Sequence, residues 1–139
     1  MSVRGWWGQA AIAASLGGAT LIIHTVGLRR AVRIVWWLAD LVPAPSLAAP
    51  PEQLAERRAQ AIAAVAERLP FKPRCLPRAL VLAGLLRRRK LAGELCVGTR
   101  IAGEFAAHAW IEMEGRPVYE AEDLNVVYRC LWRLPTVTP

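Results

Sequence analysis

Three residues in the second half of the chain have side chains that suit nucleophilic catalysis: Cys75, His108 and Glu120. A thiol nucleophile needs a base that takes its proton, and the base needs a third group that holds it in orientation. A cysteine, a histidine and a carboxylate can fill these three roles in that order. The set therefore predicts a cysteine enzyme in which a thiolate attacks an acyl carbon.

The surroundings of Cys75 favour a reactive thiolate. We expect a helix to begin at Cys75 or Leu76, because Pro77 is tolerated in a first turn, where its missing N–H breaks no intrahelical bond. Unpaired N–H groups and the positive end of the helix dipole lower the pKa of a thiol at such a position. Arg74 and Arg78 add positive charge nearby. The sequence thus predicts that Cys75 is the nucleophile.

His108 is expected to lie at the start of a strand that a hairpin brings back. Residues 108–114 and 116–119 are two strand candidates, and Glu114-Gly115 is a tight turn between them. In an antiparallel pair, the returning strand would carry Glu120 back alongside His108. A carboxylate at that place could accept a hydrogen bond from the imidazole and stabilise its charged form.

The rest of the chain places helices before strands. Residues 52–69 form an amphipathic pattern, and residues 79–86 are apolar on nearly every face, so the second helix should be central and buried. Residues 95–101 are a further strand candidate, with Cys96 expected in the core. This order predicts an α+β fold, with N-terminal helices followed by a small antiparallel sheet.

The N-terminal part is strongly apolar. Residues 6–28 carry no formal charge and are about long enough to cross a bilayer. Arginines follow, and then a second apolar stretch, residues 34–42. We interpret residues 1–43 as an apolar helical segment packed on the domain or on a partner protein. Contact of residues 6–42 with a membrane surface is the alternative, because hydropathy alone does not separate the two.

Composition narrows the class of protein. The chain has 139 residues, 55% of them apolar, and a net charge of +7, which suits one folded domain and acidic partners. No nucleic-acid-binding motif accompanies the basic residues. Three cysteines and two histidines without close pairs predict no metal site, no cofactor and no disulfide framework. A reducing cytoplasm fits this cysteine usage, with membrane association as an alternative.

Several segments together resemble the lasso-peptide leader-peptidase family. The resemblance covers about residues 52–125 and rests on Glu67–Ala79, which contains Cys75, and on the segment His108–Glu120. It implies a transglutaminase-like, papain-related cysteine peptidase fold over residues 52–139, after a proline-rich linker at 44–51. The combined pattern is specific, whereas each segment alone would be weak.

The resemblance also implies an activity and partners. Enzymes of this family cut the bond between the leader and the core of a ribosomally made lasso-peptide precursor. The freed core amine is then closed into a macrolactam by an ATP-dependent cyclase. In split systems a small leader-recognition protein presents the precursor, and the short chain resembles this split form. By position, Cys75 is the nucleophile and His108 the base.

The third catalytic residue and the reaction itself have alternatives. Glu120 stands where the family usually has Asp, and its longer side chain leaves Glu122 and Asp123 as substitutes. A different acyl-transfer enzyme on the same fold, such as a transglutaminase or an amidase, would use the same cysteine and histidine. A non-catalytic scaffold of the maturation complex would keep the fold without the reaction.

Overall fold

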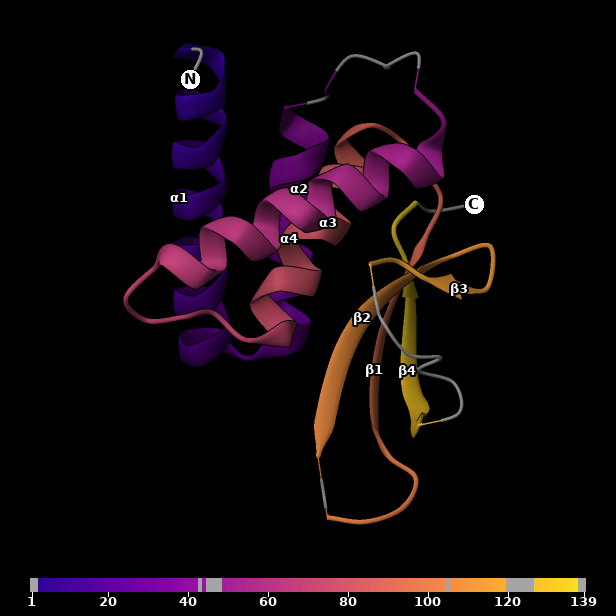
Figure 1. Cartoon of the computed structure of the whole chain (residues 1–139). Helices are drawn as coiled ribbons and strands as arrows, with labels where there is room; N and C mark the ends of the chain where they lie inside the picture. Colours follow the sequence, from indigo (N-terminus) through magenta and orange to yellow (C-terminus); the bar gives the residue numbers. More distant parts are fainter. Residues whose placement is uncertain (1–2, 43, 45–48, 105, 120–126, 138–139) are drawn as a thin grey trace.

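Four helices precede a sheet of four strands in the computed structural model, which describes residues 3–42, 44, 49–104, 106–119 and 127–137 (Figure 1). The helices are α1 (Val3–Val26), α2 (Leu28–Leu41), α3 (Pro51–Arg68) and α4 (Cys75–Arg88). The strands are β1 (Glu94–Arg100), β2 (Ala107–Met113), β3 (Arg116–Pro117) and β4 (Tyr128–Pro135). The helices form one layer and the sheet the other, so the predicted α+β fold is confirmed.

Helix α4 is the centre of the molecule. Every residue from Ala79 to Gly84 is buried, as expected for a helix that is apolar on nearly every face. The other three helices contact α4, and strands β1 and β2 contact it as well. The core therefore lies on both sides of α4. This packing fixes the position of Cys75, the first residue of α4, relative to the sheet.

Helix α3 has the amphipathic form that its sequence predicts. Pro51 occupies the first turn, where a missing N–H costs nothing, and Leu54, Ile62 and Val65 are buried. The helix ends at Arg68, just before Pro70. Pro51 was expected in the linker, but it is already helical, because the fixed φ of proline suits the start of a helix.

The sheet is antiparallel throughout, in the order β3-β2-β1-β4. Cys96 in the middle of β1 lies opposite Trp110 of β2 and opposite Arg133 of β4. Glu114 and Gly115 connect β2 to β3 with φ of 52° and 77°, the positive values of a two-residue hairpin turn. The predicted hairpin is confirmed.

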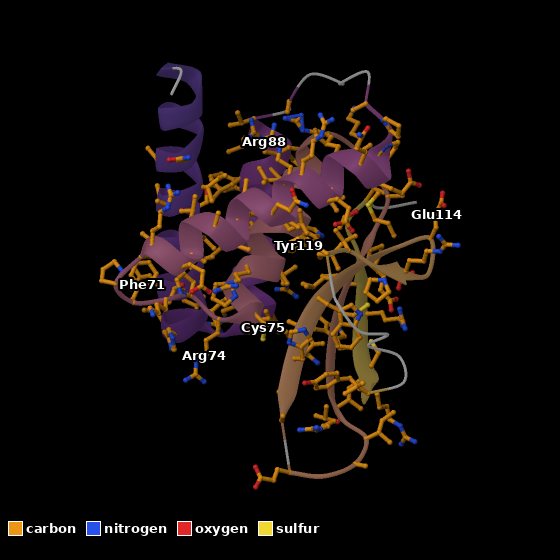
Figure 2. The ribbon with its side chains drawn as sticks, in the orientation of Figure 1. Phe71, Arg74, Cys75, Arg88, Glu114 and Tyr119 are labelled. Carbon is orange, nitrogen blue, oxygen red and sulfur yellow. The ribbon has the colours of Figure 1, made fainter. Side chains whose placement is uncertain are left out.

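Strand β3 is shorter than its sequence predicts. The Val118 N–H still donates to the Ile111 carbonyl at 2.8 Å, but Tyr119 has a φ of 54° and leaves the extended conformation. Its own N–H donates instead to Glu56 Oε1 of α3 at 2.7 Å. The chain therefore turns from the sheet toward α3 at Tyr119, which lies between them in Figure 2.

The sheet has two different faces. Residues such as Leu95, Ile111 and Met113 pack against the helices in the main core. The alternate residues Cys96 and Trp110 form a second, small cluster, joined by Tyr128 and Cys130 of β4. Cys96 is fully buried there, as expected. His108 has the same parity along β2 as Trp110, so it belongs to this second face.

The N-terminal helices pack on the domain along one side only. Ile12, Leu16 and Ala19 of α1 join the core, and α1 contacts α2, α3 and α4. Helix α2 is tied to α4 by Arg87, which makes two hydrogen bonds to the carboxylate of Asp40, at 3.0 and 2.9 Å. Gly8–Val26 is nevertheless long and apolar enough to cross a membrane, and only 11% of it is buried.

Candidate active site

Cys75 lies where the sequence predicts, as the first residue of α4 (Figure 2). The N-cap residue, Arg74, is extended and makes no side-chain hydrogen bond to the helix end, so the first-turn N–H groups are free of a side-chain cap. One of them, the N–H of Leu76, donates to the Cys75 sulfur. The helix start thus points hydrogen-bond donors at the thiol.

The first turn of α4 is braced by Arg78. Its Nε donates to the Pro73 carbonyl at 2.8 Å, and its Nη2 pairs with Glu67 Oε1 of α3 at 3.2 Å. These bonds link the segment before Cys75 to both α3 and α4. Arg78 therefore holds the approach to Cys75 in place, besides contributing the positive charge that the sequence suggested.

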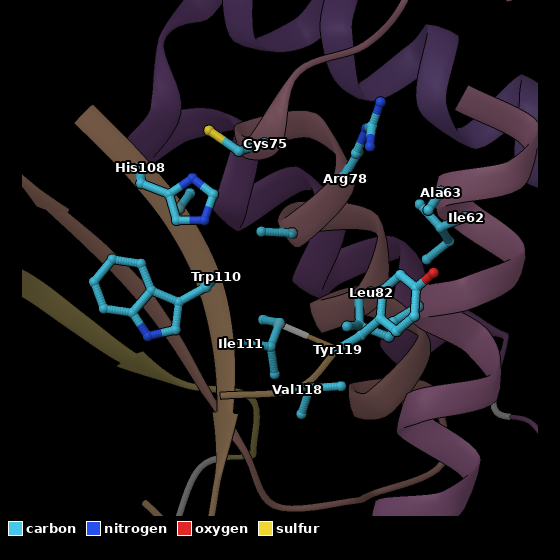
Figure 3. A pocket seen from close by; sticks show the side chains of 13 residues that line it. Ile62, Ala63, Cys75, Arg78, Leu82, His108, Trp110, Ile111, Val118 and Tyr119 are labelled. Carbon is cyan, nitrogen blue, oxygen red and sulfur yellow. The ribbon is translucent and has the colours of Figure 1, made fainter. Parts of the chain in front are cut away.

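The imidazole of His108 is hydrogen-bonded to the Cys75 thiol. In Figure 3 the sulfur points from α4 toward the ring, which extends from β2. The N–H of Ala109, the next residue along β2, also donates to the sulfur. The sequence-predicted nucleophile and base are therefore side by side, although they come from different layers.

The pKa of the Cys75 thiol reflects two opposing causes. Burial raises it, because the charged thiolate is less well solvated. The hydrogen bond with His108, the N–H of Ala109, the charge of His108 and the N–H of Leu76 act the other way. Together they prevail, so the pKa of Cys75 is lowered from its ordinary value. A lowered pKa makes the thiolate, which is the nucleophilic form, more abundant at neutral pH.

The geometry of β2 explains how α4 can come so close to it. Strand β3 pairs only with Glu112 and Met113, at the far end of β2. Among the residues that the structure describes, none forms a strand beside His108 and Ala109 on that edge of β2. A backbone N–H that an edge strand leaves unpaired can bind another group, and here the Ala109 N–H binds the thiol.

Cys75 and His108 open into a cleft of about 230 Å³. Helix α4 forms one wall and β2 the opposite one, while α3 and Tyr119 lie at the end away from the thiol (Figure 3). The walls are mainly apolar and include Ile62, Leu82, Ile111 and Val118. A substrate chain placed here would bring a carbonyl next to the sulfur, with an apolar side chain deeper in the cleft.

The ring of His108 packs against two other aromatic rings, those of Trp110 and Tyr128. Its ring stacks on Trp110, with centroids 5.8 Å apart and planes 18° apart, and lies 5.3 Å from the ring of Tyr128. The indole Nε1–H of Trp110 donates to Glu112 Oε1 at 3.2 Å. Trp110 is only 2% exposed, as expected of a core residue, yet it also lines the cleft. Trp110 therefore packs against the imidazole of His108 on one side and is hydrogen-bonded to the buried Glu112 on the other.

Glu112 is a buried carboxylate, 4% exposed, and it is paired with Arg133 of β4. The same Arg133 donates to Glu94 Oε2 at 3.2 Å and to the Cys96 sulfur at 3.4 Å. The side-chain oxygen and sulfur atoms of Glu94, Cys96 and Glu112 lie within 4.8 Å of one another, close enough for all three to bind one metal ion. The guanidinium already supplies the positive charge, and burial together with the charge of Glu112 raises the pKa of Cys96. A protonated thiol is a poor metal ligand, so this cluster is better explained as an ion pair.

The proposed third catalytic residue lies outside the described residues. This applies to Glu120 and to its two alternatives, Glu122 and Asp123. Tyr119, directly before Glu120, is described and lines the same cleft as His108. The role of a carboxylate in orienting His108 stays a prediction from the sequence.

Three contributors to the site were missed by the sequence interpretation: the N–H of Ala109, Tyr128 and the ion pair of Glu112 with Arg133. Strand β4, which carries Tyr128 and Arg133, was not expected. In the structure its half-buried and exposed residues alternate from Tyr128 to Pro135. The sequence carries this signal only in part, because Arg129 and Arg133 fall on the exposed side but so does the apolar Leu131. The edge position of Ala109 follows only from the pairing of the strands.

Comparison with known proteins identifies the family. No match is found among curated proteins or among solved structures. A family model described as the transglutaminase-like superfamily, whose members are generally cysteine-dependent enzymes, matches residues 22–133, well over half of the chain. The match includes Cys75, His108 and all four strands except the last two residues of β4. The chain therefore belongs to the transglutaminase-like superfamily.

Proposed function

We propose that the chain is a cysteine peptidase that removes the leader from a lasso-peptide precursor. The observation that carries the proposal is the hydrogen bond between Cys75 and His108 at the mouth of a cleft. A thiol with a lowered pKa beside an imidazole suits acyl transfer from a peptide bond. The resemblance of residues 52–125 to leader peptidases supports the choice of substrate.

In the proposed reaction, His108 takes the proton of Cys75 and the thiolate attacks the scissile carbonyl carbon. The C–N bond then breaks as His108 returns the proton to the leaving amine, which becomes the N-terminus of the core peptide. The leader stays on Cys75 as a thioester. A water molecule, deprotonated by His108, attacks this thioester and releases the leader as a carboxylate, and the thiol regains its proton.

The surroundings of the thiol also stabilise the thiolate from which the attack starts. The N–H groups of Leu76 and Ala109 point at the sulfur from the helix end and from the strand edge. Preorganised donors of this kind stabilise a thiolate before it attacks, without reorganisation of solvent. We infer that they keep the nucleophile charged while the carbonyl of the precursor is brought next to it.

The proposed partners follow from the substrate. A leader-recognition protein would bring the precursor to the cleft, because the cleft, at about 230 Å³, is too small to hold a whole leader. An ATP-dependent cyclase would take the freed core. The peptidase therefore needs to bind only the few residues around the cut.

The test combines the purified chain with a lasso-type precursor and its leader-recognition protein, and follows the peptides by mass spectrometry. Cys75→Ala is the inactive variant. Cys130→Ala is the matched control, because Cys130 is a half-buried thiol that bonds the Trp132 carbonyl and does not line the cleft. We expect a single cut with the wild type and the control, and none with Cys75→Ala.

A transglutaminase or amidase on the same fold is distinguished in the same experiment. Adding a primary amine as acyl acceptor, with a glutamine-containing peptide, would give a peptide–amine product if the chain is a transglutaminase. Amine transfer without leader cleavage would refute the peptidase proposal. The absence of both reactions, while the recognition protein still binds the leader, would favour a scaffold.

A further inference from the structure

Large apolar side chains are exposed on the outer side of α1 and α2. Leu21 of α1 is 64% exposed, and Trp37 and Leu41 of α2 are 63% and 57% exposed. We call these residues, together with the other large exposed apolar residues of the two helices and the C-cap residue Val42, the N-terminal surface: Leu21, Val26, Trp37, Leu38, Leu41 and Val42. An apolar patch of this kind on a folded chain usually marks an interaction surface.

The three hydroxyl side chains of α1 do not oppose the removal of water, and its other polar residues within Gly8–Val26 are Gln9 and His24. The hydroxyls of Ser15, Thr20 and Thr25 each donate to the carbonyl four residues earlier in the same helix, at 2.8, 2.8 and 2.9 Å. Hydroxyls that are satisfied within the helix cost less to transfer into apolar surroundings. No Asp, Glu, Lys or Arg occurs in Gly8–Val26. Most of the outer side of α1 can therefore be desolvated at little cost, whereas the exposed His24 can stay at the polar level of the headgroups.

Basic residues follow directly after α1. Arg29, Arg30 and Arg33 are exposed in the first turns of α2, just past the turn at Gly27. Trp37 follows Arg33 after four residues and Leu41 follows Trp37 after four more, a spacing that places the three on one side of the helix. Its opposite side, with Ala31, Val32 and Ala39, is buried in the protein. Arginine, tryptophan and leucine on one exposed helical face are typical of a helix at a membrane surface.

A groove enlarges the apolar area between the helices. It has a volume of about 480 Å³ and is lined by α1, α2 and α4, with Gly18, Leu38 and Leu85 among its residues. Figure 1 shows α1 along the edge of the molecule away from the sheet. Contact through this side would leave the cleft at Cys75 and His108 open to substrate.

We propose that the N-terminal surface docks the protein on an anionic lipid bilayer, with α1 and α2 lying on the membrane. We choose anionic rather than neutral lipid because the exposed Arg29, Arg30 and Arg33 would be attracted to negatively charged headgroups. The contact is peripheral, since Ile12 and Leu16 commit the other side of α1 to the core. The protein does not need to unfold in order to bind.

The test measures sedimentation of the full chain with vesicles of phosphatidylcholine alone and of phosphatidylcholine with phosphatidylglycerol. Arg29→Gln/Arg30→Gln/Arg33→Gln should lower partitioning onto the anionic vesicles about a hundredfold, since each arginine near such a surface contributes about fivefold. The control, Arg57→Gln/Arg116→Gln/Arg129→Gln, removes the same charge from exposed positions of α3, β3 and β4. It should change partitioning by less than about threefold, because these arginines lie away from the surface and salt screens their charge.

A second variant tests the apolar part. Trp37→Gln/Leu41→Gln exchanges two exposed side chains, so the fold should persist, and circular dichroism checks this. We expect weaker binding to anionic vesicles with unchanged circular dichroism. The proposal is overturned if the wild type stays in solution with anionic vesicles, or if both arginine variants bind equally. It is also overturned if the Arg29→Gln/Arg30→Gln/Arg33→Gln variant binds vesicles as the wild type does but no longer binds the leader-recognition protein. None of these outcomes depends on cleavage, so the peptidase proposal is tested separately.

Discussion

The thiol of Cys75, at the start of α4, is hydrogen-bonded to the imidazole of His108 on β2. The two residues come from the helical layer and from the sheet, and they meet beside the part of β2 that β3 does not pair with. The same edge offers the N–H of Ala109 to the sulfur. The chemistry of the chain therefore depends on how α4 is held against β2, and the following predictions address this arrangement.

Removal of either partner should abolish catalysis. Cys75→Ala and His108→Ala are each expected to lower kcat/KM for precursor cleavage by at least about a thousandfold, since the thiolate and its base act as a unit. For the same reason the double variant should be no slower than either single one. Rates from single-turnover mass spectrometry check this. A His108→Ala enzyme that keeps more than a tenth of the activity would show that another group is the base.

The reactivity of Cys75 should depend on pH in a predictable direction. Its pKa is lowered, so alkylation by iodoacetamide should rise with a midpoint below that of a free thiol. In His108→Ala the midpoint should move to higher pH, because burial still raises the pKa and the main opposing group is gone. Mass spectrometry of the labelled peptides separates the cysteines. Cys96 should stay unlabelled near neutral pH, since burial raises its pKa.

The ion pair behind His108 should contribute to stability. Arg133→Gln leaves Glu112 buried without its cation and should lower the free energy of unfolding by about 2 kcal/mol, less than for a fully buried pair because Arg133 is half exposed. Urea unfolding measures this. Arg129→Gln, an exposed arginine on the same strand, should cost less than about 0.5 kcal/mol.

A double-mutant cycle separates the interaction free energy of Glu112 with Arg133 from the effect of each substitution alone. Glu112→Gln keeps an oxygen for the Trp110 indole but removes the charge. In Glu112→Gln/Arg133→Gln the stability should recover part of the loss, because the buried carboxylate is no longer present. Equal losses in the double variant and in the sum of the single ones would mean that the two side chains do not interact.

Gly98 should tolerate no side chain. A Cβ there would meet the backbone carbonyl of Arg129 and come within 3.0 Å of Trp110 Cη2. We expect Gly98→Ala to destabilise the fold by about 2–3 kcal/mol, since the backbone of β4 must shift. It should also slow cleavage, because Trp110 supports His108.

Gly18→Ala is the matched control for this substitution. Gly18 lies inside α1, and a Cβ there meets no atom within 4 Å. Alanine has the higher helix propensity, so Gly18→Ala should leave stability unchanged or raise it by up to about 1 kcal/mol. Thermal unfolding of the two variants gives the comparison. Similar losses in both would contradict the crowding at Gly98.

The local elements could be predicted from the sequence alone. The start of α4 at Cys75 follows from the prolines around it, and the hairpin follows from Glu114-Gly115, whose positive φ values suit such a turn. The burial of α4 follows from its apolar residues on every face. These features depend on residues within a few positions of one another, so the chain specifies them before any distant contact forms. The order of helices before strands follows from the same local patterns.

Only the tertiary structure decided what surrounds His108. Strand β4 pairs with β1, and through it Tyr128 reaches the imidazole while Arg133 reaches Glu112. A carboxylate on a strand is normally expected in water, and its burial makes sense only once a cation from another strand lies beside it. Such pairings join residues far apart in the chain, and their free energy depends on both partners and on the shape of the sheet between them. The sequence alone therefore indicated the cysteine and the histidine, and the packing of α4, β2 and β4 decided how they are held together.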